Sequence, residues 1–220
     1  MMHYHATPED HAKLQRKGFL LVDSGATYMD GTTDITRTYP LGPLTEDEKR
    51  FYTWTLQSHI DLAKAVWLDY CECKMIDTIA REPLWRHLIN YRCGTGHSVS
   101  FVGNVHEGPH ALNGRNTTLM RPGMIVTDEP GVYETDLVGI RIENELVCVH
   151  KADNQYGTFL GFEPIMFVPI ATSPIVPGVL TKDELDWLNN YHRQVFEKLA
   201  PRLNDEEREW LAKKCAAIGC

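Results

Sequence analysis

Four acidic side chains and one histidine stand where the surrounding sequence would otherwise predict apolar strand residues. They are Asp23, Asp34, His97, Glu129 and Glu143. Each of them, taken alone, is better explained as a turn, solvated or loop residue. A carboxylate on a buried strand face carries a large desolvation cost unless a cation meets it, and four converging carboxylates would require cations. The joint pattern therefore predicts a fold that gathers these side chains around metal ions.

The size and charge of the chain limit the classes of protein to which it can belong. With 220 residues, 43% of them hydrophobic, it can bury one full core with room for a short appendage. A formal net charge of −8 argues against a nucleic-acid partner, because binding phosphates requires clustered Lys and Arg. The polar residues 1–5 predict neither a secretory signal nor a membrane anchor. We therefore expect a cytoplasmic protein with no membrane partner.

The six cysteines are expected to be free thiols, because a chain with an ample core does not need disulfides. Cys71 and Cys73, together with Cys93, leave a zinc site as a minor alternative. Their spacing differs from the usual pair of cysteines separated by two residues.

A hairpin is predicted near the N-terminus. Residues 18–23 form an apolar run typical of a buried strand, Asp30-Gly31 is a turn signal, and the Thr- and Ile-rich residues 32–39 form the returning strand. If the loop has an even number of residues, Asp23 and Asp34 lie on the same face of the hairpin.

Two helices should follow. Thr45 and Glu48 have the spacing of a capping box, and this helix is expected to run to about Trp67. A second helix is expected over residues 75–90, broken or kinked by Pro83. Several glycines then indicate a turn-rich region, which contains His97, His106 and His110.

Three further strands are predicted, over residues 124–129, 139–150 and 159–170. Arg141 and Glu143 are two residues apart on the second of these, so we expect them on one face, with Arg141 holding the Glu143 carboxylate.

The C-terminal part changes character. Thr181 and Glu184 form another capping box before an apolar stripe of helical spacing, and one more helix is expected from about Asp205. We therefore divide the chain into a catalytic domain, residues 1–172, and a C-terminal helical extension, residues 173–220.

Several ordered motifs in this sequence resemble the pita-bread metallopeptidase family, and most closely its three-domain Xaa-Pro aminopeptidases. The likeness covers nearly the whole chain, from His3-Tyr4 to residues 186–192. The motifs are Asp23–Thr38, Gly94–His97, Asn104–Pro109, Val126–Tyr133 and Ile140–Asn144. The resemblance implies an α+β fold, with a curved, mostly antiparallel sheet, helices on its outer face and the metal ions inside the curve.

The resemblance also implies roles for particular residues. Asp34 and Glu143 would bridge two divalent metal ions, Asp23 would bind one of them, and His97 with Glu129 would complete the other. An oxygen-rich set with one imidazole suits manganese, cobalt or zinc better than a structural thiolate site would, and the resemblance favours manganese among the three. Glu129 would also shuttle a proton. The residues expected to contact the substrate or to support the metal ligands are His3, His106, Tyr133 and Arg141.

Three departures from the family pattern concern the pocket and the N-terminus. Cys93 stands where the family has a histidine, and Ser98 and Ser100 stand where it has glycines. The His3-Tyr4 motif, which lies well inside the family's domain, is here at the start of the chain. We therefore expect an N-terminally incomplete domain that leaves apolar surface to cover, and a homodimer as the consequence.

The predicted function is removal of the N-terminal residue from peptides whose second residue is proline, by a dinuclear metalloaminopeptidase. The proline preference rests on the resemblance alone. The alternative is a catalytically weak or inactive pseudo-peptidase that binds metal or peptides. The same scaffold serves other chemistries, so the fold does not decide between the two.

Overall fold

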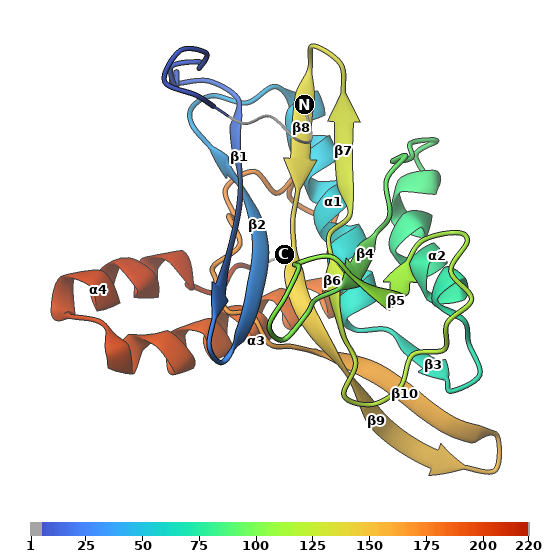
Figure 1. The fold of residues 1–220 in the computed structure, drawn as a ribbon. Coiled ribbons are helices and arrows are strands. Elements are labelled where there is room, and N and C mark those ends of the chain that lie inside the picture. The colour runs from blue at the N-terminus through green and yellow to red at the C-terminus, as the bar shows by residue number, and fades with distance from the viewer. Residues whose placement is uncertain (1–5, 220) are drawn as a thin grey trace.

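The computed structural model describes residues 6–219. Its main sheet has six strands in the order β3-β10-β9-β6-β4-β5, and every neighbouring pair is antiparallel (Figure 1). The strands are β3 Val66–Leu68, β4 Gly96–Ser98, β5 Glu107–Leu112, β6 Ile125–Asp128, β9 Asn144–Asn154 and β10 Gly157–Pro164.

Two antiparallel hairpins stand beside this sheet. One pairs β1, Phe19–Tyr28, with β2, Gly31–Pro40, and the other pairs β7, Gly131–Glu134, with β8, Val138–Arg141. In the first, Tyr28 pairs with Gly31, so the loop has two residues. Asp23 then lies opposite Thr36, and Asp34 lies opposite Gly25. Since side chains alternate along a strand, Asp23 and Asp34 lie on one face, as the parity argument predicted.

Residues 6–219 contain four α-helices, which pack beside the sheets: α1 Glu46–Ala63, α2 Cys73–Trp85, α3 Lys182–Leu199 and α4 Asp205–Lys214. The capping boxes predicted at Thr45 and Thr181 are confirmed, because both side chains accept a hydrogen bond from the backbone of the expected Glu. A third box begins α4 at Asn204. These reciprocal bonds satisfy backbone groups that a helix start leaves unpaired.

Several predicted boundaries are wrong. The first helix ends at Ala63, and Trp67 belongs to β3, where it pairs with Leu160 and packs on Phe162. The second helix ends at Trp85, two residues after Pro83, rather than at residue 90. The first boundary was decided by pairing with a strand far along the chain, whereas the second lies just after the break predicted at Pro83.

Three further corrections concern strands. The strand expected over residues 139–150 is divided into β8 and β9, because the backbone N–H of Glu143 donates to the carbonyl of Thr36. The region expected to be turns contains β4 and β5. The strand expected over residues 159–170 ends at Pro164.

The core has two main parts. One lies between α1, α2 and the main sheet, and includes Leu62, Ile76 and Leu146. The other joins α1 to α3, with Leu56, Ile60 and Leu188 among its members. The C-terminal helices therefore share a core with the first helix, and the boundary at residue 172 stays a prediction.

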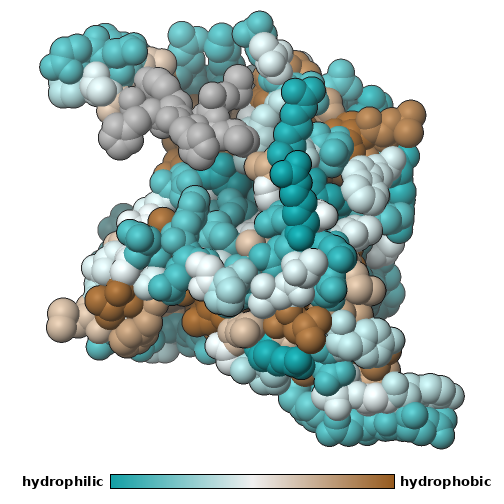
Figure 2. Space-filling view, turned by 45° about the vertical axis from the view of Figure 1, so that its right-hand side comes forward, coloured by the Kyte–Doolittle hydropathy of each residue, from teal (hydrophilic) through white to brown (hydrophobic). Residues whose placement is uncertain are grey.

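The surface seen in Figure 2 is largely hydrophilic, with hydrophobic residues in scattered groups. Among the described residues, no helix is both long enough and apolar enough to cross a bilayer.

Candidate metal centre

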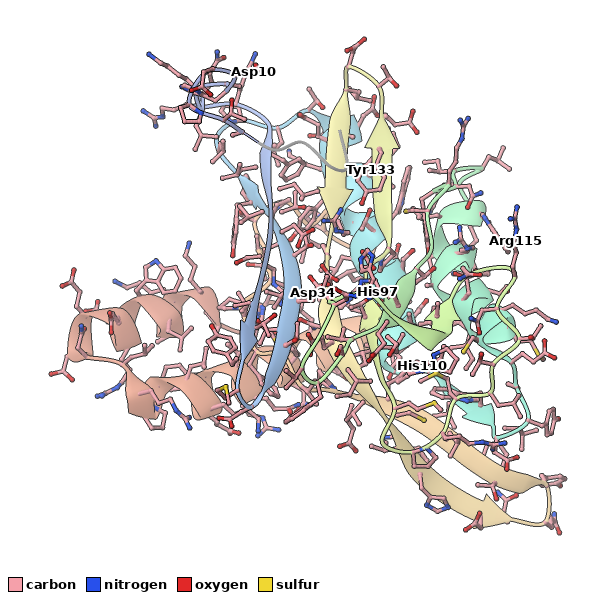
Figure 3. The ribbon with its side chains drawn as sticks, in the orientation of Figure 1. Asp10, Asp34, His97, His110, Arg115 and Tyr133 are labelled. Carbon is pink, nitrogen blue, oxygen red and sulfur yellow. The ribbon has the colours of Figure 1, made fainter. Side chains whose placement is uncertain are left out.

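Asp34, His97 and Glu143 meet in one place although they come from different parts of the chain. Asp34 lies on β2, His97 on β4, and Glu143 between β8 and β9. Each offers a ligand atom, and these atoms lie within 4.8 Å of one another. Asp34 and Glu143 are buried, with 8% and 1% of their surface exposed. Figure 3 shows Asp34 and His97 together near the middle of the ribbon.

The His97 ring is oriented by its own strand. Its Nδ1 lies 3.1 Å from the carbonyl oxygen of Ser98, which can only accept a hydrogen bond. Nδ1 therefore carries a proton, and Nε2 points at Asp34 Oδ2, 3.4 Å away, and Glu129 Oε1, 3.3 Å away. A nitrogen facing two carboxylate oxygens requires a proton or a metal ion between them, and metal-binding histidines are commonly held in this way.

Arg141 connects the remaining candidates. Its Nη2 donates to Asp23 Oδ2 at 2.5 Å and its Nη1 to the Tyr133 hydroxyl at 2.9 Å. Its Nε lies 3.8 Å from Glu129 Oε2 and 3.9 Å from Glu143 Oε2. Asp23 is half exposed and faces Arg141, outside the group formed by Asp34, His97 and Glu143.

Two of the predicted histidines remain. The His106 ring lies against the His97 ring, with centroids 3.9 Å apart, so it borders the same site. His3 lies outside the described residues.

Burial and mutual repulsion disturb the acids of this site. Burial, together with the charges of Glu129 and Asp34, raises the pKa of Glu143 well above its ordinary value. Burial likewise raises the pKa of Glu129 to about 6. Burial alone would lower the pKa of His97, but its contacts with Asp34 and Glu129 outweigh this and the pKa is raised. Divalent cations would favour the ionised acids and the neutral imidazole, so the donor set fits metal ions.

Two threonines complete the site, and sequence reasoning missed both. The Thr36 hydroxyl donates to Glu143 Oε2 and accepts from Arg141 Nε at 3.0 Å. The Thr127 hydroxyl accepts from the backbone N–H of His97 at 2.9 Å and donates to Glu129 Oε1 at 3.0 Å. Their signal was available, because each lies two residues from a candidate ligand and strand alternation puts such residues on one face.

Behind the ligands lies a buried polar network. His59 Nδ1 lies 3.0 Å from Oδ2 of Asp128 and 3.2 Å from its backbone carbonyl, with hydrogen-bond geometry only to the carbonyl. His59 Nε2 lies 3.2 Å from the Asn144 amide nitrogen, and Asn144 accepts from Arg37 at 2.8 Å. Asp128 and Asn144 directly adjoin Glu129 and Glu143 in the sequence, so this network fixes the backbone that carries two candidate ligands.

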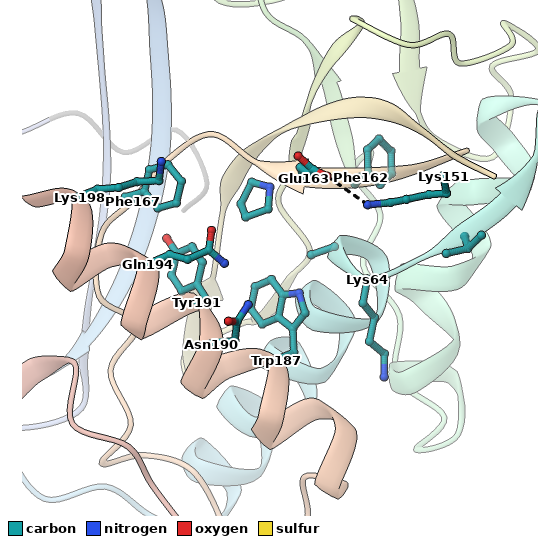
Figure 4. Close-up of a pocket in the computed structure, with 13 residues that line it drawn as sticks. Lys64, Lys151, Phe162, Glu163, Phe167, Trp187, Asn190, Tyr191, Gln194 and Lys198 are labelled. Atoms are coloured by element: carbon teal, nitrogen blue, oxygen red, sulfur yellow. Dashed lines mark hydrogen bonds and ion pairs between the residues drawn. The ribbon is translucent and has the colours of Figure 1, made fainter. Parts of the chain in front are cut away.

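A hollow of about 590 Å³ lies away from the candidate ligands, against α3 and β10 (Figure 4). Three lysines line it, and each has a partner. Lys64 pairs with Asp61 and Asp183, Lys151 pairs with Glu163, and Lys198 lies over the Phe167 ring. None of the candidate site residues lines this hollow, so it is separate from the metal centre.

A curved antiparallel sheet with helices on its outer face, enclosing carboxylates and a histidine, defines the pita-bread class of proteins. Residues 1–150 match the metallopeptidase family M24, and residues 158–218 match the C-terminal region of peptidase M24. The chain belongs to metallopeptidase family M24.

Named relatives agree with this assignment. The chain is 40% identical over 226 residues to a probable Xaa-Pro aminopeptidase P of Coprinopsis cinerea, with 99% of the chain and 36% of the relative covered. It is 43% identical to aminopeptidase P2 of Arabidopsis thaliana, with 96% and 31% covered. The chain thus spans about a third of the length of these relatives.

Solved structures show the same fold. The X-prolyl aminopeptidase of Caenorhabditis elegans, described as a cytosolic enzyme with a di-nuclear active site, superposes with a TM-score of 0.84 at 38% identity. The match covers 90% of this chain and 33% of that one. A prolidase from Pyrococcus furiosus superposes with a TM-score of 0.58 at 27% identity, covering 67% of this chain and 41% of that one.

Proposed function

We propose that this chain carries the catalytic centre of a dinuclear metalloaminopeptidase that removes the N-terminal residue from peptides with proline second. The observation that carries the proposal is the meeting of Asp34, His97 and Glu143, whose ligand atoms lie within 4.8 Å of one another. The naming of its relatives as Xaa-Pro aminopeptidases supports the substrate class.

The residues that would hold two divalent ions are Asp34 and Glu143 as bridges, Asp23 for one ion, and His97 with Glu129 for the other. The two-ion count is supported by the di-nuclear site of the C. elegans enzyme. Donors that are mainly oxygen with one imidazole suit manganese, zinc or cobalt. Among these we propose manganese, on the resemblance to the family. When bound, such ions polarise the peptide carbonyl and activate water for attack on it.

The protein's own groups then position the substrate and move protons. Glu129 would serve as the proton shuttle, and the hydrogen bond from Thr127 to one of its carboxylate oxygens supports this role by orienting it. His106 lies against His97 and would contact the substrate beside the ligands, together with His3. Tyr133 and Arg141, joined by a 2.9 Å hydrogen bond, would orient the acidic ligands, because Arg141 also donates to Asp23.

The test joins metal analysis to peptide hydrolysis. The manganese-loaded chain should bind metal and cleave Leu-Pro-Gly but not Leu-Ala-Gly, whereas His97→Ala should lose both metal and activity. Glu163→Gln, a change of an exposed acid on β10, is the control and should behave like the unchanged chain. Metal binding without hydrolysis of either peptide would favour the inactive pseudo-peptidase.

A cytoplasmic location is also proposed, on the description of the C. elegans enzyme as cytosolic.

A further inference from the structure

A cavity of about 630 Å³ adjoins the metal centre. It lies between the tip of the β1-β2 hairpin, the segment after β4, and strands β6 and β9. Three of its lining residues lie within two positions of a candidate ligand in the sequence. Thr33 precedes Asp34, Ser98 follows His97, and Glu145 lies two residues after Glu143. We call this cavity the acceptor pocket. A peptide bound at the metal centre would have this pocket beside it.

Three polar atoms of the acceptor pocket's lining residues are buried without a hydrogen-bond partner. They are Thr32 Oγ1, His110 Nδ1 and Glu145 Oε1. Glu145 and His110 are only 4% and 6% exposed. An unpaired buried polar atom is costly, so such a group within a native site calls for a partner.

The bonding of His110 defines what this partner must offer. Its Nε2 lies 2.7 Å from the carbonyl oxygen of Ile125, which can only accept, so Nε2 carries the proton. In the neutral ring Nδ1 is then an acceptor. The Glu145 carboxylate is also an acceptor, and the Thr32 hydroxyl accepts as readily as it donates. The pocket therefore suits a ligand that donates several hydrogen bonds.

The charge and walls of the acceptor pocket narrow the ligand further. Asp30 and Glu145 are its acids, and no Lys or Arg stands among the described residues that line it. Phe101, Ile165 and Met166 add apolar wall. Acceptors and acids combined with apolar walls match a cation carried on an aliphatic stem, and a lysine ammonium has three N–H donors for three unpaired atoms.

We propose that the acceptor pocket binds a basic side chain, Lys or Arg, of the peptide substrate. The inference rests on the proposed function and narrows its substrate class. Because the second residue is proline, the basic side chain belongs to the first or the third residue of the peptide. A metal ion is a poorer occupant, because within residues 6–219 the group with three close ligand residues is Asp34, His97 and Glu143, and the Asp30, Glu145 and His110 side chains of the pocket do not form such a group.

The test uses pairs of peptides that differ only in the ammonium group at the end of one side chain. Lysine and norleucine have the same straight stem, so Lys-Pro-Gly is compared with norleucine-Pro-Gly, and Gly-Pro-Lys with Gly-Pro-norleucine. For one pair we expect kcat/KM to be about tenfold or more higher with lysine, the range for a hydrogen bond to a charged group. Glu145→Gln should bring that ratio towards one, whereas Glu163→Gln should leave it unchanged.

Binding is measured separately, so that the two proposals can fail independently. Calorimetry with the same peptides should show tighter binding of the lysine peptide, lost in Glu145→Gln, even if no peptide is cleaved. Cleavage without a lysine preference in either pair would overturn the pocket assignment while leaving the aminopeptidase intact. A preference that survives Glu145→Gln would overturn it as well. Should Glu145→Gln fail to fold, as judged by thermal unfolding, Thr32→Ala takes its place and should lower the ratio.

Discussion

The hydroxyl of Thr36 offers the sharpest test of how the metal centre is held. It is completely buried, donates to Glu143 Oε2 and accepts from Arg141 Nε at 3.0 Å. Thr36→Val keeps the shape of the side chain and removes only the hydroxyl. Both partners are ionisable, and hydrogen bonds to charged groups contribute about 1.5–3 kcal/mol each.

The loss should appear chiefly in metal affinity. Without the hydroxyl, the nearest remaining contact of the Glu143 carboxylate with Arg141 is the longer one of 3.9 Å, so the carboxylate is less firmly oriented toward the ions. Loss of a group that orients a metal ligand typically costs 10- to 100-fold in affinity, or about 1.4–2.8 kcal/mol. Competition titration of manganese against a chelator measures this change.

Thr158→Val is the matched control. Its hydroxyl also donates to a carboxylate, Asp153 Oδ1 at 2.8 Å, but it lies on β10 in an exposed pair. Manganese affinity should be unchanged in this variant. Equal affinities for Thr36→Val and the unchanged chain, or equal losses in the two variants, would refute the orienting role of Thr36.

Four further predictions can be tested on the same chain. Asp34→Ala and Glu143→Ala should each lower metal content more than Asp23→Ala, because a bridging ligand serves both ions; equal stoichiometry in elemental analysis would contradict this. Arg141→Met should weaken metal affinity about 10- to 100-fold while all five ligands remain, and an unchanged titration would show that it does not orient them. Light scattering should give a dimer or larger assembly, and a clean monomer mass near 25.1 kDa would contradict it. Burial and then the charge of Arg37 lower the pKa of His192 from 6.5 to about 4. Between these two pH values His192 binds a proton in the unfolded chain but not in the folded chain, so the free energy of unfolding falls as the pH drops. Urea unfolding should show about 2 kcal/mol lost to this group between pH 7 and pH 5, and His192→Gln should reduce that loss; an equal pH dependence in both proteins would contradict the assignment.

The sequence by itself determined the features that depend on a few neighbouring residues. The capping boxes at Thr45 and Thr181 and the β1-β2 hairpin were predictable, because each depends on contacts within a short segment. The candidate donors were also visible, since a carboxylate in a strand-like segment needs an explanation wherever the strand goes.

Only the tertiary structure decided which of these residues meet and what holds them. The break at Glu143 follows from its hydrogen bond to Thr36, a residue 107 positions away, and no local pattern encodes it. The same holds for Arg141, which joins Asp23 to Tyr133, and for Glu145, which lines a cavity formed by segments that are far apart in the sequence. Strand pairing over such distances depends on burial and on backbone bonds that form once the chain has folded, so hydrophobic periodicity could place the strands only approximately.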